Sequence, residues 1–469
     1  MHGDTKENEP RTGSRDDGDR GVPSARTLAA DTLARVWEDG AYAAATLDAG
    51  LRRAPRLDPR DVALATELVY GVLRTTASLE REIARFAKGD RYRRKPAIRA
   101  HLLIATYSLL FLERVPAFAA VAEAVAAVKG LGGAQIAGFA NAVLRKIARE
   151  GRVGERDVRL RDAIVESVPA WLRERLRESL GGSDEAVREL LAPGALAPSV
   201  CLCARAGADP AAWLETLRAA LPAATVERGE LSERALVVRG GGDPAAWPGA
   251  GEAWRVQEEG AQLIAQALAA RPGDVVLDAC AGRGGKTLLL AEAVGPTGFV
   301  DAADRHPKKM AALRAAEAKA RGRAAAHLCV RDAVAVDWTL GSGELAGRSY
   351  DRILVDAPCT GTGTLRHRPE IAERLSAADV ERLAALQLAI LARTATHLAP
   401  GGTMLYAVCS VLSRECEHVV DALVRTTELV PAPFEADTLR RLAGGGATLH
   451  LSPAAHGTDG YFLASLRRK

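Results

Sequence analysis

The sequence predicts a three-part protein, with a helical N-terminal region, a small mixed α/β segment and a C-terminal domain built on a parallel sheet. Apolar residues recur at helical spacing up to about residue 150, and from residue 251 onward short apolar runs alternate with amphipathic stretches. Strands that alternate with helices form a parallel sheet covered on both faces. A chain of 469 residues is also too long for one ordinary core.

Residues 1–23 are expected to form a disordered tail, because they are charged and rich in Gly, Asp and Arg. They contain no apolar stretch typical of a secretory signal, and no apolar run in the chain approaches the roughly 18 residues of a membrane-spanning helix. Seven cysteines without CxxC spacing favour a reducing compartment over a disulfide framework or a zinc site. We therefore expect a cytoplasmic monomer without membrane association or bound metal.

Residues 24–160 are predicted to form an all-helical domain, in which a basic segment runs from Glu80 to His101. Eight basic residues stand there against three acidic ones. Such clustering suits contacts with nucleic-acid phosphates, and a solvated helix–loop–helix surface explains it equally well. The basic residues are Arg81, Arg85, Lys88, Arg91, Arg93, Arg94, Lys95 and Arg99.

Residues 161–250 are predicted to form a small α/β linking domain. Two helical patterns are followed by short strand-like runs at 199–203 and 235–239. Cys201 and Cys203 are two positions apart and therefore face the same side of one strand. Without other clustered ligands, this pair is expected to pack in a core rather than to bind a metal.

Residues 251–469 are predicted to form the sheet domain. Helical patterns at 308–320 and 377–397 separate several of its strands. The six strand candidates are 275–279, 299–304, 327–332, 352–356, 403–408 and 461–466.

A glycine-rich turn follows the first of these strands. Its glycines allow a tight turn and a close approach of the backbone to a ligand. The turn misses the Walker A pattern because Cys280 stands where glycine is required, and it misses GxGxxG because Thr287 replaces the last glycine. A nucleoside triphosphate is therefore disfavoured.

Acidic residues end the next three strands. Asp304 follows the glycine-rich turn by about 20 residues, the spacing at which a carboxylate reaches a ribose hydroxyl. Asp332 and Asp356 end the third and fourth strands. Carboxylates at successive strand ends around such a turn suit an adenosine-type cofactor.

Two cysteines also follow apolar strands, Cys359 after 352–355 and Cys409 after 403–408. Ligands bind at the carboxyl ends of strands in open α/β sheets, so thiols there suggest covalent chemistry. Two small buried hydrophobes would be the alternative. The nearby Arg366, His367 and Arg368 could activate a thiol, bind phosphates or be solvated loop charge.

Several motifs together resemble those of the S-adenosylmethionine-dependent RNA cytosine-C5 methyltransferases, with the bacterial RsmB/Fmu/Sun group, which acts on 16S rRNA, as the nearest match. They are Asp278-Ala-Cys-Ala-Gly-Arg-Gly-Gly-Lys-Thr, Asp356-Ala-Pro-Cys-Thr-Gly-Thr-Gly, Cys409-Ser and His456-Gly-Thr-Asp-Gly-Tyr-Phe. Three N-terminal segments resemble the NusB-like RNA-binding domain of that group: Glu67-Leu-Val-Tyr-Gly-Val-Leu-Arg, Phe111-Leu-Glu-Arg-Val-Pro and Asn141-Ala-Val-Leu-Arg.

The resemblance implies a NusB-like domain, a class I (Rossmann-like) methyltransferase domain, S-adenosylmethionine as cofactor and 16S rRNA as partner. It makes Cys409 the nucleophile that adds to C6 of cytosine, Cys359 the residue that aids product release, and Asp356 a contact to the pyrimidine. Asp304 would bind the ribose and Asp332 the adenine. The rest of the cofactor site would comprise Cys280, Ala281, Gly282, Arg283, Gly284, Gly285, Lys286 and Asp356.

The chemistry explains why such an enzyme needs a thiol. Carbon C5 of cytosine is a weak nucleophile, and addition of a thiolate to C6 turns it into an enamine-like carbon that attacks the sulfonium methyl group. Gly361 and Gly363 would leave room for a base turned out of its stack. Two positions depart from the family: Gly282-Arg283 replaces Ala-Pro, which should loosen the turn, and Val408 replaces the threonine before the nucleophile.

Three alternative functions remain open from the residues. The enzyme could methylate another RNA such as tRNA, or it could act on a protein or small molecule. The chain could also be a non-catalytic ribosome-assembly factor whose helical domain binds RNA. The thiol pair and the appended basic helical domain favour the methylation of cytosine in 16S rRNA.

Overall fold

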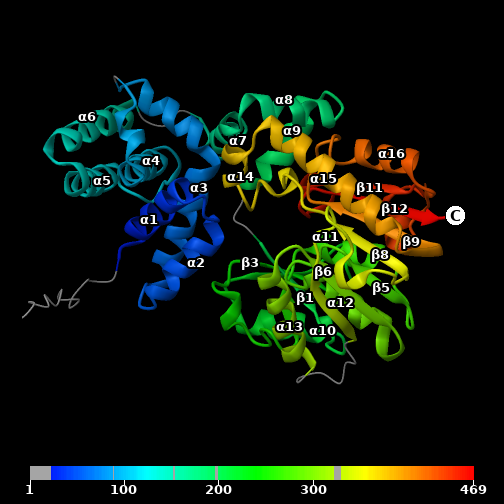
Figure 1. The fold of residues 1–469 in the computed structure, drawn as a ribbon. Coiled ribbons are helices and arrows are strands. Elements are labelled where there is room, and N and C mark those ends of the chain that lie inside the picture. Colours follow the sequence, from blue (N-terminus) through cyan, green and yellow to red (C-terminus); the bar gives the residue numbers. More distant parts are fainter. Residues whose placement is uncertain (1–22, 88, 151–153, 196–198, 322–328) are drawn as a thin grey trace, which may run out of the picture.

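The computed structural model describes residues 23–469 except 88, 151–153, 196–198 and 322–328. It consists of a helical N-terminal region, a small antiparallel sheet and a larger sheet with helices on both faces (Figure 1). The predicted fold class is thus confirmed. The expected disordered tail lies outside the described residues apart from Pro23.

Within the described residues, six helices form the N-terminal domain, and two of them begin at side chains that suit a helix start. Ser24 accepts a hydrogen bond from Thr27 N, and Asp58 accepts one from Arg60 N just before Pro59. The helices are α1 (Ala25–Glu38), α2 (Ala43–Arg53), α3 (Pro59–Ala84), α4 (Pro96–Phe111), α5 (Ala117–Gly132) and α6 (Ala134–Glu150), with a 3-10 turn at Arg91–Arg94.

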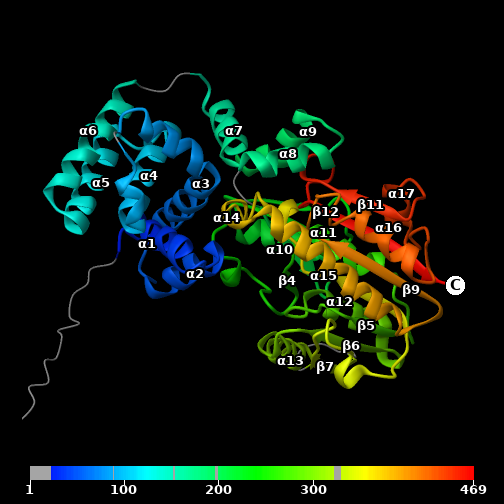
Figure 2. The same cartoon turned by 45° about the horizontal axis from the view of Figure 1, so that its top comes forward.

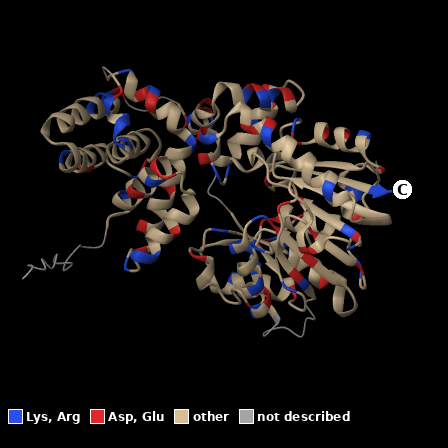
Figure 3. Cartoon of the chain, viewed as in Figure 1, with Lys and Arg blue, Asp and Glu red and all other residues tan. Residues whose placement is uncertain are grey.

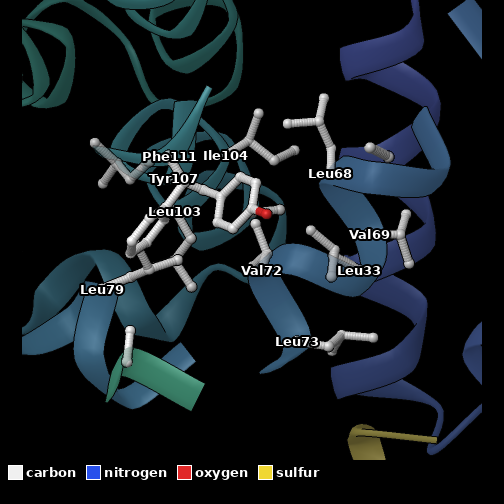
Figure 4. Packing of buried hydrophobic residues seen from close by; sticks show 14 of the residues in the cluster. Leu33, Leu68, Val69, Val72, Leu73, Leu79, Leu103, Ile104, Tyr107 and Phe111 are labelled. Atoms are coloured by element: carbon white, nitrogen blue, oxygen red, sulfur yellow. The ribbon is translucent and has the colours of Figure 1, made fainter. Parts of the chain in front are cut away.

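The core of this domain extends beyond the predicted boundary at residue 160. Tyr107 and Leu103 of α4 pack against α1 and α3 at its centre (Figure 4). Buried residues of three further helices join the same core, and so do Leu365 and Val411 from the C-terminal domain. The C-terminal domain is therefore packed directly on the helical domain. The further helices are α7 (Arg156–Ser167), α8 (Ala170–Ser179) and α9 (Asp184–Leu191), followed by a 3-10 turn at Ala192–Ala195.

The small sheet is antiparallel, in the order β2-β3-β1-β4. Cys203 is buried in the core that the large sheet shares with α11 (Glu259–Ala267), and Cys201 lies within 3.6 Å of the Gln262 side chain of that helix. Both thiols therefore face a helix of the C-terminal domain. The elements are β1 (Val200–Ala204), α10 (Pro210–Ala220), β2 (Thr225–Arg228), β3 (Ala235–Arg239) and β4 (Trp254–Val256), with a 3-10 turn at Pro244–Ala246.

The large sheet has the strand order β10-β12-β9-β8-β5-β6-β7, and β11 pairs with β12. Its strands are β5 (Val275–Asp278), β6 (Phe299–Asp304), β7 (Val330–Ala335), β8 (Tyr350–Asp356), β9 (Leu398–Val408), β10 (Leu429–Pro431), β11 (Thr448–Leu451) and β12 (Tyr461–Arg468). Its helices are α11 (Glu259–Ala267), α12 (Gly285–Val294), α13 (Pro307–Arg321), α14 (Glu370–Arg374), α15 (Ala377–Ala395), α16 (Glu417–Thr426), α17 (Asp437–Leu442) and α18 (Pro453–His456), with 3-10 turns at Gly295–Thr297, Gly343–Leu345 and Thr362–Thr364.

Apolar side chains of the central strands alternate between two cores. Leu354 and Leu405 face Leu263 and Leu288 on α11 and α12, whereas their strand neighbours join the core that contains α15 and α16. This burial on both faces explains the continuous apolar runs of the sequence.

Two strand predictions need correction. The last predicted strand, β12, runs antiparallel to β9 and also to its other two partners, β10 and β11. Only a short segment separates β12 from β11, and a parallel crossover between them would need a dozen or more residues. The third predicted strand, 327–332, extends further: β7 continues to Ala335, and residues 327 and 328 lie outside the described residues.

The order of the strands reverses between β5 and β8. From β5 the chain proceeds outward to β6 and β7, and then returns to build β8 and β9 on the other side. A crevice outside the strand ends forms at such a switch point. Within the described ranges, no helix is long and apolar enough to cross a bilayer.

Candidate active site

The glycine-rich turn begins where β5 ends. Gly282 and Gly284 adopt φ values of 58° and 89°, which glycine reaches without steric cost. A side chain at Gly284 would also press on Leu313. The turn is fixed at its base by Asp278, whose carboxylate accepts a hydrogen bond from Thr287 at 2.7 Å. Burial raises the pKa of Asp278 to about 7.

Asp304 holds the other side of this turn. Its carboxylate accepts hydrogen bonds from Gly282 N at 3.1 Å and from Lys309 Nζ at 3.1 Å. Ala281 donates a backbone hydrogen bond to Ala303 on the same strand. The end of β6 and the turn therefore form one rigid rim.

Asp332 does not join this rim. It lies inside β7 rather than at its end, and its carboxylate pairs with Arg348 at 2.6 Å. The acidic residue that follows the strand is Asp337, which lines the same cavity as Asp304. The predicted end of this strand is too early, and Asp337 was therefore not among the predicted site residues. The signal was present, because the apolar alternation continues through Val334 and Val336.

Lys286 and Asp356 connect the turn to β8. The Lys286 ammonium donates a hydrogen bond to the Asp356 carboxylate at 2.6 Å. Burial acts to lower the pKa of Lys286, but Asp356 outweighs it and holds that pKa above its usual value. Lys286 is therefore a fixed cation. It lines one cavity with Cys409 and interacts electrostatically with that thiol, so it can stabilise a thiolate there.

Cys359 and Cys409 lie together, with their sulfur atoms 3.3 Å apart. Both are free thiols. The hydrogen bond to Cys409 and burial raise the pKa of Cys359 well above its usual value, so Cys359 keeps its proton. The third thiol in the same cavity, Cys280, is also kept protonated, because burial raises its pKa.

Glu415 fixes the two loops that carry these thiols. Its buried carboxylate accepts hydrogen bonds from Thr360 N at 2.9 Å, from Ser410 Oγ at 2.6 Å and from Gln387 Nε2 at 3.0 Å. Thr360 follows Cys359 and Ser410 follows Cys409, so one carboxylate sets the position of both. Glu415 was not among the predicted site residues, because no local sequence pattern shows which distant groups a buried carboxylate will bind.

One of the glycines after Cys359 serves a different purpose from the predicted one. A Cβ at Gly363 would overlap the backbone of Gly460, with which Gly363 forms a backbone hydrogen bond. Gly363 thus allows a close approach of two chain segments rather than space for a base. Gly361 adopts a φ of 74°. Val408 is buried in the sheet core.

The basic residues near Cys359 have separate roles. Arg366 and His367 are held by Asp459, the latter at 3.0 Å between Nδ1 and the carboxylate. Arg368 is exposed and lines both cavities that meet at Cys409. Of the three, Arg368 is the one whose charge faces the open space.

Two cavities meet at Asp356 and Cys409. The first has a volume of about 760 Å³ and reaches Asp304 and Asp337, whereas the second has about 590 Å³ and reaches Lys286 and the small sheet. We call these two cavities together the thiol cleft. Arg283 is exposed over a smaller cavity of about 260 Å³, which Gly285 also lines and which shares Lys286 and Asp356 with the thiol cleft. The residues at the thiol cleft fit an adenosine-type cofactor at the Asp304 end of the first cavity and a substrate base at Cys409.

Four arginines of the predicted basic segment pair with carboxylates, whereas Arg91, Arg94 and Lys95 form no ion pair among the described residues. Arg93 and Arg99 pair with Glu80, and Arg81 pairs with Glu166. Arg85 pairs with Glu82 and Glu150. Figure 3 shows positive and negative residues alternating over these helices. Lys88 lies outside the described residues.

The C-terminal and N-terminal parts of the chain each match a known protein family. Residues 265–467 match the family model described as 16S rRNA methyltransferase RsmB/F, and residues 23–149 match the NusB family. A Bacillus subtilis protein described as a probable ribosomal RNA small subunit methyltransferase B is 31% identical, over 95% of this chain and 99% of its own length. A Xanthomonas campestris ribosomal RNA small subunit methyltransferase B is 32% identical, over 95% and 97%.

A solved structure shares the fold over nearly the whole chain. The crystal structure described as PH0851 superposes with a TM-score of 0.78 and covers 95% of this chain and 99% of that one, at 20% sequence identity. This likeness concerns the fold, including the helical domain.

Proposed function

The chain belongs to the RsmB/F family of S-adenosylmethionine-dependent 16S rRNA methyltransferases, and from that premise we propose that it methylates C5 of a cytosine in 16S rRNA through a covalent bond between Cys409 and C6. The observation that carries this proposal is the pair of thiols 3.3 Å apart beside Asp356, where the two cavities of the thiol cleft meet.

The cofactor fits the first cavity. Asp304 would accept hydrogen bonds from ribose hydroxyls and Asp337 would receive the adenine side, with the backbone of the glycine-rich turn on the opposite side of Asp304. When bound there, S-adenosylmethionine supplies an electrophilic methyl group. Asp332 pairs with Arg348 and does not line this cavity.

Attack begins at Cys409. Its thiolate, stabilised by the Lys286 cation, forms a bond from Sγ to C6 of the cytosine. Asp356, fixed by the same lysine, accepts a hydrogen bond from the base edge and orients the ring. The added electron pair makes C5 nucleophilic, and C5 then takes the methyl group.

Release needs the second thiol. The proton on C5 leaves to solvent, the double bond between C5 and C6 re-forms, and the bond from Cys409 to C6 breaks. Cys359, which holds its proton next to Cys409, donates that proton to the departing sulfur. A proton shift between the neighbouring sulfur atoms then restores the starting state, so the cycle releases one proton in total.

The test is methyl transfer from labelled S-adenosylmethionine to 16S rRNA from a strain that lacks the modification, with bisulfite sequencing to locate the product. Cys409→Ala should abolish transfer. Cys359→Ala should accumulate an RNA–protein adduct that survives a denaturing gel. Cys329→Ala, a cysteine outside the thiol cleft, is the matched control and should keep full turnover. Full turnover by Cys409→Ala, or a product on tRNA alone, would overturn the proposal.

A further inference from the structure

One exposed aromatic side chain of the helical domain lies in the thiol cleft. Tyr42, which stands just before α2, lines the first cavity together with Cys409, although the rest of that cavity comes from the C-terminal domain. Its side chain is 62% exposed, so it contributes little to the packing of the fold.

The position of Tyr42 is unusual for its residue type. It occupies the N-cap of α2 and makes no capping hydrogen bond with its side chain. Residues with short polar side chains are preferred at this position, and Ser24, Asp58 and Ser376 cap other helices of this chain in that way. Neither packing nor capping therefore explains a large exposed aromatic ring here.

The backbone around Tyr42 is held by residues of the C-terminal domain. Arg374 of α14 donates hydrogen bonds to the carbonyl oxygens of Val36 and Ala41, and Glu370 accepts one from Ala43 N at 3.2 Å. These contacts fix the backbone on both sides of Tyr42. Figures 1 and 2 show α14 between the helical domain and α15.

A cation accompanies the ring. The guanidinium of Arg374 lies 5.8 Å from the ring centre of Tyr42. Across the described ranges, neither Arg374 nor Arg368 forms an ion pair with a carboxylate, whereas Arg382 in the same cavity pairs with Asp379 and Lys309 pairs with Asp304. The open end of the cavity thus offers an aromatic face with two uncompensated positive charges.

These features match the way in which proteins hold single-stranded RNA. Bases stack on exposed aromatic rings and guanidinium planes, and arginines contact the phosphates between them. We propose that Tyr42 and Arg374 form a stacking platform for a base that neighbours the target cytosine in the RNA strand, with Arg368 on the adjoining phosphate. This inference rests on the proposed function and identifies a substrate contact that comes from the helical domain.

The platform assigns that domain a direct part in substrate binding. The strand would enter over Tyr42, and the target base would continue to Cys409 in the same cavity. A strand in this place needs the target region to be unpaired, so the preferred substrate is rRNA with an accessible loop.

The test compares Tyr42→Ala, Tyr42→Leu and Tyr42→Phe in the full-length protein. Binding of unmodified 16S rRNA is measured by filter binding, together with KM and kcat. Removal of the ring in the first two variants should weaken RNA binding roughly tenfold and raise KM with little change in kcat, since a stacked base is lost. Tyr42→Phe keeps the ring and should behave as wild type.

Two controls separate this role from a structural one. Phe118→Ala removes a ring that is 78% exposed on α5, outside the thiol cleft, and should leave RNA binding unchanged. The thermal unfolding temperature and the affinity for S-adenosylmethionine should be the same in all variants. RNA that carries 5-iodouridine should crosslink on irradiation to the peptide that contains Tyr42.

These experiments can contradict the stacking platform and the proposed function independently of each other. RNA affinity of Tyr42→Ala within twofold of wild type, with crosslinks confined to other peptides, would overturn the platform even if the enzyme methylates normally. A wild type that binds RNA through Tyr42 but transfers no methyl group to cytosine would overturn the proposed function and leave the platform standing.

Discussion

Two charged regions of this molecule, the basic segment from Glu80 to His101 and the thiol cleft, use their charges in opposite ways. In the basic segment, arginines such as Arg81 and Arg93 meet glutamates at the surface of the helical domain. In the thiol cleft, Lys286, Asp356 and Glu415 are buried or partly buried and hold the reactive loops, while Arg368 stays uncompensated. A count of basic residues in a segment therefore does not measure the charge that is available to a ligand.

The largest effect on turnover and stability is expected from a substitution at Glu415. Glu415→Ala leaves buried donors on Thr360, Ser410 and Gln387 without an acceptor, so kcat should fall by about 100-fold or more, and the free energy of unfolding by about 3 kcal/mol. Affinity for S-adenosylmethionine should change little, because the glycine-rich turn is held by other residues. Single-turnover methyl transfer and urea denaturation measure both quantities.

Glu417→Gln is the matched control, since Glu417 pairs with His450 at an exposed site. It should keep normal turnover. If Glu415→Ala lost stability but kept kcat, the carboxylate would support the fold without positioning the thiols.

The next effect concerns Asp278 and pH. Burial raises the pKa of Asp278 from 3.8 to about 7, so the folded protein binds this proton more tightly than the unfolded chain. The contribution of Asp278 to stability is therefore greatest below pH 4 and falls as the pH rises to about 7. Asp278→Asn should remove this loss of stability. The difference in the free energy of unfolding between wild type and variant should therefore change by a few kcal/mol between pH 4 and 8, on the order expected from the pKa shift.

Urea denaturation of both proteins at several pH values between 4 and 8 measures that difference. Parallel stability curves over this range would show that Asp278 ionises in the native protein as it does in the unfolded chain.

A smaller effect is expected at Arg368. Arg368→Gln should weaken binding of 16S rRNA several-fold and lower the slope of log affinity against log salt by about 0.7, the value for one phosphate contact on a single strand. Filter binding at a series of salt concentrations provides the measurement. An unchanged salt slope would remove Arg368 from the RNA path.

The smallest effect is expected in the basic segment. Arg81 and Glu166 form an exposed pair at 2.9 Å, so Arg81→Ala should change the free energy of unfolding by less than about 1 kcal/mol and RNA affinity by less than twofold. The same binding assay applies. A tenfold loss of affinity would contradict this expectation and favour a phosphate-binding surface, one of the two roles that the sequence left open for this segment.

Much of the architecture could be predicted from the sequence, because the signals are local. Helical periodicity identified the N-terminal domain, and apolar runs found the central strands. The strand ends located Asp304, Asp356, Cys359 and Cys409 on one edge of the sheet, where the structure brings them to one cavity. Strand direction was less accessible, since the orientation of β12 depends on the short connection from β11.

By itself, the sequence determined the fold class and the thiols and acids at the strand ends, because the period of an apolar pattern and the end of a strand are properties of neighbouring residues. Only the tertiary structure decided which charges are compensated and which side chains share a cavity. Glu415 reaches back to Thr360, and Tyr42 meets Arg374 across more than three hundred residues of chain. Such pairings depend on packing between distant segments, and no local pattern encodes them.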